Sequence, residues 1–313
     1  MRHTKKLVFS FSFTFLACCT LVTIYSSCGN HLSKNRTAVD IPYPLANPDS
    51  TPLRFLPATV SSDSLDFGST FSPDGTSFYF ARSENKKLRI YVTAHDGKNW
   101  TIPRLAPFTE TLYSQADPAF SPDGKLYFIS NRPKDTADTQ PDYDIWFISA
   151  LPGGQWSAPE NLEPVNSDSN EFYISFSKNG TLYFSSSRAG GFGEEDIYIS
   201  KFNKEKFDAP VNAGATINTK RSEYDPGISA SGSVIVFASS NRDDGFGGAD
   251  LYISQRAKDD TWKPAVNLGN RFNTKTREYC PYFSPDSKFF FFSSEGDIKW
   301  VDARILEKQA GKL

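Results

Sequence analysis

The chain has 313 residues, a formal net charge of −2 and a sequence pI of about 6.0. Its lysines and arginines are scattered along the sequence rather than gathered into the basic surface that nucleic-acid binding requires, so we expect no nucleic-acid partner. Phe (27) and Tyr (14) are abundant whereas Met occurs once, which is typical of pleated, half-buried β-sheet surfaces and argues against a helical protein.

Residues 1–27 have the pattern of a bacterial secretion signal and are excluded from the fold. The basic residues Arg2, Lys5 and Lys6 precede an uncharged apolar stretch over residues 7–25. Ser-Ser-Cys-Gly follows at 26–29, and a small residue directly before Cys at this place resembles a lipobox. The segment therefore predicts a lipoprotein in which Cys28 is diacylated and becomes the mature N-terminus.

Three alternatives remain for this segment. Cys18 is a competing lipidation site, although cleavage there would leave an apolar stump on the mature chain. The 19 residues of the apolar stretch are also just enough for an uncleaved anchor helix across a bilayer, and ordinary cleaved secretion is the third possibility. Residues 28–51 are polar and contain Pro42, Pro44 and Pro48, which predicts a flexible tether.

Five copies of one short motif organise the rest of the chain. Each copy is an apolar residue, then Ser, then a turn that ends in Gly, or in Ser in the last copy. The copies occupy residues 71–75, 120–124, 176–180, 228–232 and 283–287, at successive spacings of 49, 56, 52 and 55 residues. A period near 50 residues with strand-like content predicts repeated supersecondary units that bury their apolar faces against one another.

The units share one order of predicted strands. An aromatic and β-branched run follows each motif, at 78–80, 126–129, 182–184, 234–237 and 289–292. A third strand begins at Asp in the later units (Asp144, Asp196, Asp250 and Asp297). An aromatic-x-x-Pro segment or a close variant comes next, and because proline is tolerated only at a sheet edge, we expect it to be the outermost strand. Four antiparallel strands per unit describe a propeller blade.

The two ends of the repeat array complement each other. The last unit ends near Leu306 without a fourth strand, whereas residues 53–58 form an apolar, proline-containing segment ahead of the first unit. We expect this N-terminal segment to complete the last blade, which closes the ring and removes an open sheet edge. The prediction is an all-β protein with a single five-bladed propeller of four-stranded antiparallel blades over residues 52–306, followed by a C-terminal tail at 307–313.

The recurring Phe-Ser-Pro-Asp-Gly, Ser-Asn-Arg, Asp-Ile-Tyr and Trp-x-x-Pro-x-Asn-Leu phrases resemble the TolB-type, WD-like β-propeller repeat. This repeat is common in envelope proteins of Gram-negative bacteria, especially the Bacteroidetes. The resemblance covers residues 52–306 and implies an envelope lipoprotein that is held at the outer membrane by its lipid. In such lipoproteins acidic residues just after the Cys favour surface display, and their absence from residues 29–34 favours the periplasmic face. The first unit departs from the pattern, with Arg89 where the others have Asp.

Residues for common catalytic and metal sites are scarce in the predicted ring. His95 is its only histidine and lies beside Asp96-Gly97, a hairpin-turn sequence, while Cys280 is its only cysteine. The usual zinc and iron sites need several such ligands, so we expect no metal and no cofactor. The Asp residues that begin the third strands could bind Ca²⁺ with loop carbonyls, but capping of their own turns by backbone N–H groups is the favoured interpretation.

A repeated set of carboxylates and arginines remains. The members five residues before each motif are Asp66, Gln115, Glu171, Glu223 and Glu278, and those after it are Arg82, Arg132, Arg188 and Arg242, with Glu295 in the last unit. Because the motif is a turn, both positions come to one rim of the ring. The set is interpreted either as repeated salt bridges or as a polar funnel for an anionic or polyhydroxylated ligand. Asp117, Tyr173 and Asp225 share a second register, from which Gly68 and Cys280 depart.

Two functional classes follow from this set. The first is a non-enzymatic envelope propeller that binds a protein, peptide or glycan partner at its channel rim, for which the candidate residues are Arg132, Arg188, Arg242, Glu171, Glu223, Glu278, Asp117 and Asp225. The second is a carbohydrate-active enzyme that resembles glycoside hydrolases and uses Asp117, Glu171, Glu223 and Asp225. Carboxyl groups about 5 to 9.5 Å apart with no neutralising Arg would favour hydrolysis, whereas carboxylates tied to Arg would favour binding or architecture.

Overall fold

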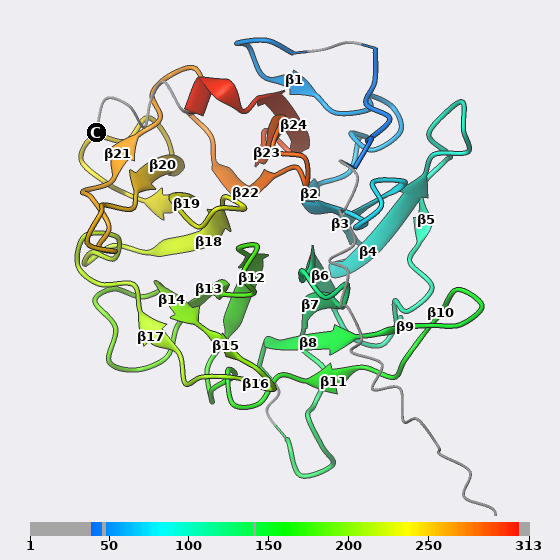
Figure 1. The fold of residues 1–313 in the computed structure, drawn as a ribbon, viewed down its shortest axis with the longest axis horizontal. Coiled ribbons are helices and arrows are strands. Elements are labelled where there is room, and N and C mark those ends of the chain that lie inside the picture. Colours follow the sequence, from blue (N-terminus) through cyan, green and yellow to red (C-terminus); the bar gives the residue numbers. More distant parts are fainter. Residues whose placement is uncertain (1–38, 46–47, 140–141, 307–313) are drawn as a thin grey trace, which may run out of the picture. The chain divides into compact units, whose positions relative to one another are not determined.

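The computed structural model describes residues 39–45, 48–139 and 142–306. Five four-stranded antiparallel sheets are arranged as the blades of a β-propeller, with one strand of each blade facing the centre of the ring (Figure 1). The predicted all-β, five-bladed fold is confirmed. Cys28, the signal segment and the C-terminal tail lie outside the described residues, and within those residues no helix has the length and apolar character needed to cross a bilayer.

Each blade runs from an inner strand at the channel to a short outer strand. The inner strands are β2 (Asp66–Phe71), β6 (Gln115–Phe120), β12 (Glu171–Phe176), β18 (Glu223–Ile228) and β22 (Glu278–Phe283). The second strands are β3 (Ser77–Glu84), β7 (Leu126–Ser130), β13 (Leu182–Ser186), β19 (Val234–Ser240) and β23 (Phe289–Ser294). The third strands are β4 (Lys87–Ala94), β8 (Asp144–Ile148), β14 (Asp196–Ser200), β20 (Ala249–Gln255) and β24 (Asp297–Asp302). The outer strands are β5 (Arg104–Leu105), β11 (Glu160–Asn161), β17 (Val211–Asn212), β21 (Val266–Asn267) and β1 (Leu53–Arg54).

The repeated motif forms the turn between the inner and second strands. In the first blade the Ser72 hydroxyl donates to Asp74 (2.5 Å) and accepts from the amide of Ser77 (2.9 Å). Gly75 follows with a φ of 73°, a left-handed conformation that glycine adopts without a steric penalty. The last blade repeats the turn, with the Ser284 hydroxyl donating to the Asp286 carboxylate (2.7 Å). The motif recurs because its Ser and Asp side chains supply the hydrogen bonds of the turn.

The outer strands lie slightly later in the chain than the sequence predicts. Four of the five begin just after the proline of the aromatic-x-x-Pro segment rather than within it, because proline has no N–H to donate to the neighbouring strand, whereas β1 lies within the predicted segment 53–58. The aromatic residues belong instead to hairpins that extend the third strands: β9 (Ala150–Leu151) pairs with β10 (Gln155–Trp156), and β15 (Phe202–Asn203) pairs with β16 (Lys206–Phe207). Trp156 packs edge-on against Phe108, with ring centroids 5.6 Å apart.

The N-terminal segment completes the last blade, as predicted. Strand β1 pairs antiparallel with β24, with Leu53 opposite Trp300, and the Phe55 amide continues the ladder by donating to the Ile298 carbonyl (2.9 Å). The Phe55 ring is fully buried, and its centroid lies 5.1 Å from that of Phe291 in the same blade and 4.7 Å from that of Phe78 in the first. One phenylalanine therefore joins the first and last blades, a contribution of about 2–3 kcal/mol from burial alone.

The packed part of the chain starts before residue 52, where we expected the tether to end. Ile41 is buried, and the Tyr43 ring stacks on Trp300 with centroids 5.8 Å apart. The Tyr43 hydroxyl donates to Asp286 (2.8 Å), and the Trp100 indole donates to the Pro42 carbonyl (2.9 Å). Residues 41–43 thus pack against the first and last blades.

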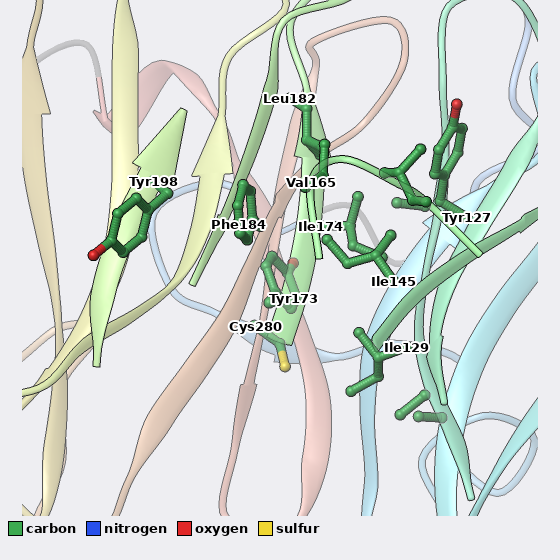
Figure 2. Packing of buried hydrophobic residues seen from close by; sticks show 14 of the residues in the cluster. Tyr127, Ile129, Ile145, Val165, Tyr173, Ile174, Leu182, Phe184, Tyr198 and Cys280 are labelled. Carbon is green, nitrogen blue, oxygen red and sulfur yellow. The ribbon is translucent and has the colours of Figure 1, made fainter. Parts of the chain in front are cut away.

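The core lies between adjacent blades rather than in one central layer. Ile145, Val165 and Ile174 pack together in one such cluster, from the second blade, the connection that follows it and the third inner strand (Figure 2). Tyr173 and Cys280 lie close together in the same view although they come from β12 and β22. Side chains of β12 and β22 therefore meet at the centre of the ring.

Candidate functional site

Three of the predicted carboxylate–arginine pairs are salt bridges within one blade. The side-chain atoms are 2.6 Å apart in Asp66–Arg82, 2.9 Å in Glu171–Arg188 and 3.1 Å in Glu223–Arg242. The three carboxylates are completely buried, whereas the arginines keep 15–17% of their side-chain surface exposed. The salt-bridge interpretation is therefore confirmed for these pairs.

Each of these arginines also makes contacts that fix its blade to the preceding connection. Arg188 donates to the Ser186 hydroxyl (2.9 Å) and to the Val165 carbonyl (2.7 Å), and its guanidinium lies 4.8 Å from the ring centroid of Tyr198. Arg242 repeats the arrangement over Tyr252, at 4.3 Å. The N–H groups of these arginines are therefore occupied by contacts within the protein. A role for Arg188 and Arg242 in ligand binding stays a prediction.

The second and last blades break the pattern. The second has Gln115 at the carboxylate position, and Arg132 pairs instead with Glu110 (3.1 Å), a more exposed residue. In the last blade Glu278 is buried without an arginine and accepts hydrogen bonds from Ser294 and Thr274, both at 2.8 Å. Glu295, at the arginine position, pairs with Lys299 (2.6 Å).

The second register identified in the sequence is a repeated backbone feature. At the third residue of every inner strand the pairing with the second strand shifts, and φ is positive, at 44–51°. The five residues are Gly68, Asp117, Tyr173, Asp225 and Cys280. Such left-handed β-bulges are unusual outside glycine, and they turn one residue of each blade toward its neighbours around the channel. The sequence revealed the shared register but not the bulge, because only Gly68 carries a local signal for positive φ.

Side chains of this bulge ring bind the backbone of neighbouring blades. The Asp117 carboxylate accepts from the Tyr173 amide (3.3 Å), and the Asp225 carboxylate accepts from the Cys280 amide (3.0 Å). The Tyr173 hydroxyl donates to the Pro281 carbonyl (2.8 Å), which links the third blade to the fifth. Asp117 and Asp225 are accordingly only 6% and 8% exposed.

These two aspartates differ from the salt-bridged acids because no ion pair to either occurs within the described residues. Burial raises the pKa of both Asp117 and Asp225 to about 7, and for Asp225 the nearby Asp117 charge adds to the effect. One oxygen of Asp117, Oδ1, is buried without a hydrogen-bond partner in the described part of the chain. Burial also raises the pKa of Cys280 well above its usual value, so this thiol is poorly suited to be a nucleophile.

A pocket of about 660 Å³ opens at the end of the ring where the inner strands begin. It lies among the third, fourth and last blades and the segment before the first. Its lining residues are Leu65, Glu194, Glu195, Ser222, Tyr224, Ser240, Asn241, Thr276, Arg277, Tyr279, Glu295 and Gly296. Sequence reasoning missed this pocket because its residues come from loops of different blades and from the second position of two inner strands, β18 and β22.

The pocket adjoins the buried aspartates. Tyr224 and Tyr279 directly precede Asp225 and Cys280 in their strands, and the Tyr224 hydroxyl lies 3.1 Å from that of Ser240. Burial raises the pKa of Glu195 to about 7, with smaller contributions from the charges of Asp225 and Glu194. Within the described residues the side chain of Glu195 makes no hydrogen bond or ion pair.

The Asp residues at the third strands act as caps, although only part of the prediction is confirmed. Asp196 accepts from the amides of Phe192 and Gly193, and Asp250 accepts from those of Phe246 and Gly247. The other two accept from side chains instead, Asp144 from Asn161 (2.7 Å) and Asp297 from Arg54 (2.8 Å). A search of the described residues for three or more His, Cys, Asp or Glu side chains that could hold a metal ion finds no such group.

The capped loops hold two aromatic rings out on the pocket side of the ring. Phe192 and Phe246 occupy equivalent loops between the second and third strands and are 50% and 48% exposed. A Cβ on Gly193 would lie 1.7 Å from the Arg221 carbonyl, so the loop packs directly on the backbone of the next connection. The glycines therefore serve close backbone packing, in agreement with their position before strands.

Comparisons with known proteins find similar propellers among solved structures. No family model and no curated protein matches the chain. Among solved structures, TolB from Acinetobacter baumannii superposes with a TM-score of 0.48 and 17% identity, over 76% of this chain and 54% of its own. A thermostable family-43 glycoside hydrolase gives 0.51 and 13% over 78% and 90%, and an endo-arabinase from Bacteroides thetaiotaomicron gives 0.48 and 14% over 82% and 96%. The chain thus has TolB-like and glycoside hydrolase propellers among its structural neighbours, and identities this low indicate shared architecture alone.

Proposed function

We propose that the ring is a non-enzymatic binding module that takes a protein, peptide or glycan partner at its channel rim, in the pocket beside Tyr224 and Tyr279. The pocket carries the proposal because Glu195, Arg277 and Tyr279 line it and make no side-chain hydrogen bond or ion pair within the described residues. Unlike Arg188 and Glu171, these groups are available to a ligand. The volume of about 660 Å³ is in the range of sites that bind small molecules or short segments of larger ones.

The surroundings of the pocket support a macromolecular partner. Phe192 and Phe246 are exposed on loops of the same side, and their loops are tied down by Asp196 and Asp250. Rigid aromatic side chains lose little conformational entropy on binding and are frequent anchors of protein interfaces.

The proposal includes attachment to the cell envelope. Its support is the sequence pattern around Cys28, which would place the ring on a lipid anchor at the periplasmic face of the outer membrane. Replacement of Cys28 by Ser should leave the protein without acyl chains and move it from the membrane fraction to the soluble fraction. Retention in the membrane would show that another element, such as an uncleaved N-terminal helix, holds it there.

Glycoside hydrolysis is the second candidate function. The observation that favours it is the Asp117–Asp225 pair, whose pKa values burial raises to about 7, a value that suits general acid catalysis, and neither of which makes an ion pair in the described part of the chain. Access to these carboxyl groups is restricted, because they are over nine-tenths buried beside the Tyr173–Pro281 hydrogen bond. Hydrolysis would require this contact to open.

The experiment compares capture and hydrolysis in one set of variants. The lipidated protein and its Tyr224→Ala/Tyr279→Ala variant are purified from their own envelope under matched conditions, and the wild type and Asp117→Asn are incubated with arabinan, xylan and peptidoglycan fragments. A binding module should retain a partner that the double variant loses and should release no sugar. Sugar release that disappears in Asp117→Asn would favour the hydrolase. Capture unaffected by the tyrosine changes would remove the pocket from the proposal.

A further inference from the structure

We propose that the pocket receives a cationic side chain, the ammonium of lysine or the guanidinium of arginine, on a peptide segment of the partner, with Glu195 as its counter-ion. This inference rests on the proposed binding function and specifies the chemistry of its ligand. The acidic residues of the ring differ in whether an arginine pairs with them. Asp66, Glu171 and Glu223 are each neutralised by an arginine.

Glu195, Asp225 and Asp117, at and behind the pocket, are not neutralised in this way, whereas Glu295 pairs with Lys299. Glu195 lines the pocket. Asp225 directly follows the lining residue Tyr224, and both Asp225 and Asp117 accept hydrogen bonds from amides of the bulge ring. None of the three has an ion pair within residues 39–45, 48–139 and 142–306. Glu194 adds a further carboxylate to the same wall. When ionised, Glu194 and Glu195 give the pocket a negative potential that favours a cation.

The other charged residues of the pocket limit where a cation can bind. Arg277 also lines the pocket but comes from the segment before β22, whereas Glu194 and Glu195 come from the loop before β14, and Glu295 is already paired with Lys299. A cation next to Glu194 and Glu195 would therefore lie against the loop of the third blade. Tyr279 can offer both its ring face and its hydroxyl to such a group, and aromatic faces attract ammonium and guanidinium ions.

A peptide cation fits these observations better than the two simpler alternatives. A metal ion needs a shell of several oxygen ligands, and no suitable group of acidic side chains occurs in the described residues. A neutral sugar would use the tyrosines but would leave Glu195 without a counter-charge. The exposed Phe192 and Phe246 rings on the same side would contact the chain that carries the cation.

The test uses the full chain and a matched pair of synthetic peptides, acetyl-Gly-Gly-Lys-Gly-Gly-amide and the same peptide with Nε-acetyl-lysine. Binding is followed by nuclear magnetic resonance titration at millimolar peptide. We expect the lysine peptide to bind and the acetylated peptide to bind at least about fivefold more weakly, because acetylation removes the charge. Glu195→Gln should weaken the lysine peptide by about fivefold. Glu295→Gln is the matched control in the same pocket and should stay within about twofold.

Affinity should also rise from about pH 6 to about pH 8, because Glu195 ionises in this range while lysine stays charged. The dependence should be weaker in Glu195→Gln, with the remainder due to Asp117 and Asp225, whose pKa values lie in the same range. Equal binding of the two peptides, absence of binding to both, or an unchanged affinity in Glu195→Gln would overturn the inference. If the envelope partner is still lost from the Tyr224→Ala/Tyr279→Ala variant in that case, the binding function stands and only the cationic ligand is wrong. If that capture is also independent of the tyrosines, both fail.

Discussion

At the scale of single residues, the ring uses its charged side chains in two distinct ways. Arginines after the second strands neutralise buried acids and stack on aromatic rings of the same blade. Within the described residues, Glu195, Asp117 and Asp225, beside and behind the pocket, have no such partner. The distinction separates residues that stabilise a blade from residues that are free to bind, although both types stand near the same rim.

Arg188→Ala should therefore destabilise the protein. It leaves Glu171 fully buried with no cationic partner, which costs about 2–4 kcal/mol in the free energy of unfolding. Arg221→Ala is the control, since the Arg221–Asp243 pair is exposed and should contribute less than about 1 kcal/mol. Urea unfolding followed by circular dichroism measures both. An unchanged stability in Arg188→Ala would show that this arginine is free for ligand binding, as the funnel interpretation requires.

Asp117 should make stability depend on pH in the direction opposite to that of an ordinary salt-bridged acid. Its pKa rises from 3.8 to about 7 on folding, so between these values the folded state binds more protons than the unfolded state. The free energy of unfolding should accordingly fall as pH rises from about 4 through 7. Asp117→Asn should make this part of the profile less steep, with the remaining slope due to other buried acids such as Asp225 and Glu195, whereas Asp243→Asn, at an exposed carboxylate, should leave it as in the wild type. Parallel profiles for wild type and Asp117→Asn would show that Asp117 is ionised in the folded protein.

At the scale of strands and loops, the repeated motif made most of the architecture predictable. Ser72, Asp74 and Gly75 form a turn by contacts within a few residues, so the sequence alone carries that information. The outer strands are two residues long, and most of them begin after a proline, which has no N–H to donate to the neighbouring strand. Their predicted positions were therefore a few residues too early in the chain. The pocket could not be predicted in the same way. Glu195 and Arg277 line one pocket only because the blades form a ring, and neither residue belongs to a repeated phrase of the sequence.

The glycine-rich loop of the third blade offers a test at this scale. In Gly193→Ala the new Cβ would clash with the Arg221 backbone, so the loop that carries Phe192 should shift and expose its amides. We expect a loss of roughly 1–3 kcal/mol and faster hydrogen exchange at Phe192. Gly248→Ala is the control, because its nearest neighbour is the flexible side chain of Arg277 at 3.3 Å. Similar exchange rates in the two variants would mean that the loop is held by Asp196 alone.

At the scale of the whole molecule, the ring depends on the chain segment before the first blade. Strand β1 and Phe55 cover the edge of β24 in the last blade. Ile41 and Tyr43 pack against the first and last blades. Closure of this kind removes the last open edge of a β-propeller and makes the blades cooperate in unfolding.

Three truncated chains separate these contributions, and they begin at residues 39, 52 and 59. The first retains all described contacts, the second loses Ile41 and Tyr43, and the third also loses β1 and Phe55. We expect the chain from 59 to be less stable than the chain from 52 by about 3–5 kcal/mol, because a buried aromatic residue and a strand pairing are both removed. With β24 uncovered, it should also associate through that edge, and light scattering should detect dimers or larger species. The chain from 52 should remain monomeric with a smaller loss of stability relative to the chain from 39. A monomeric chain from 59 with the thermal midpoint of the chain from 52 would show that the remaining strands hold the ring closed without the N-terminal segment.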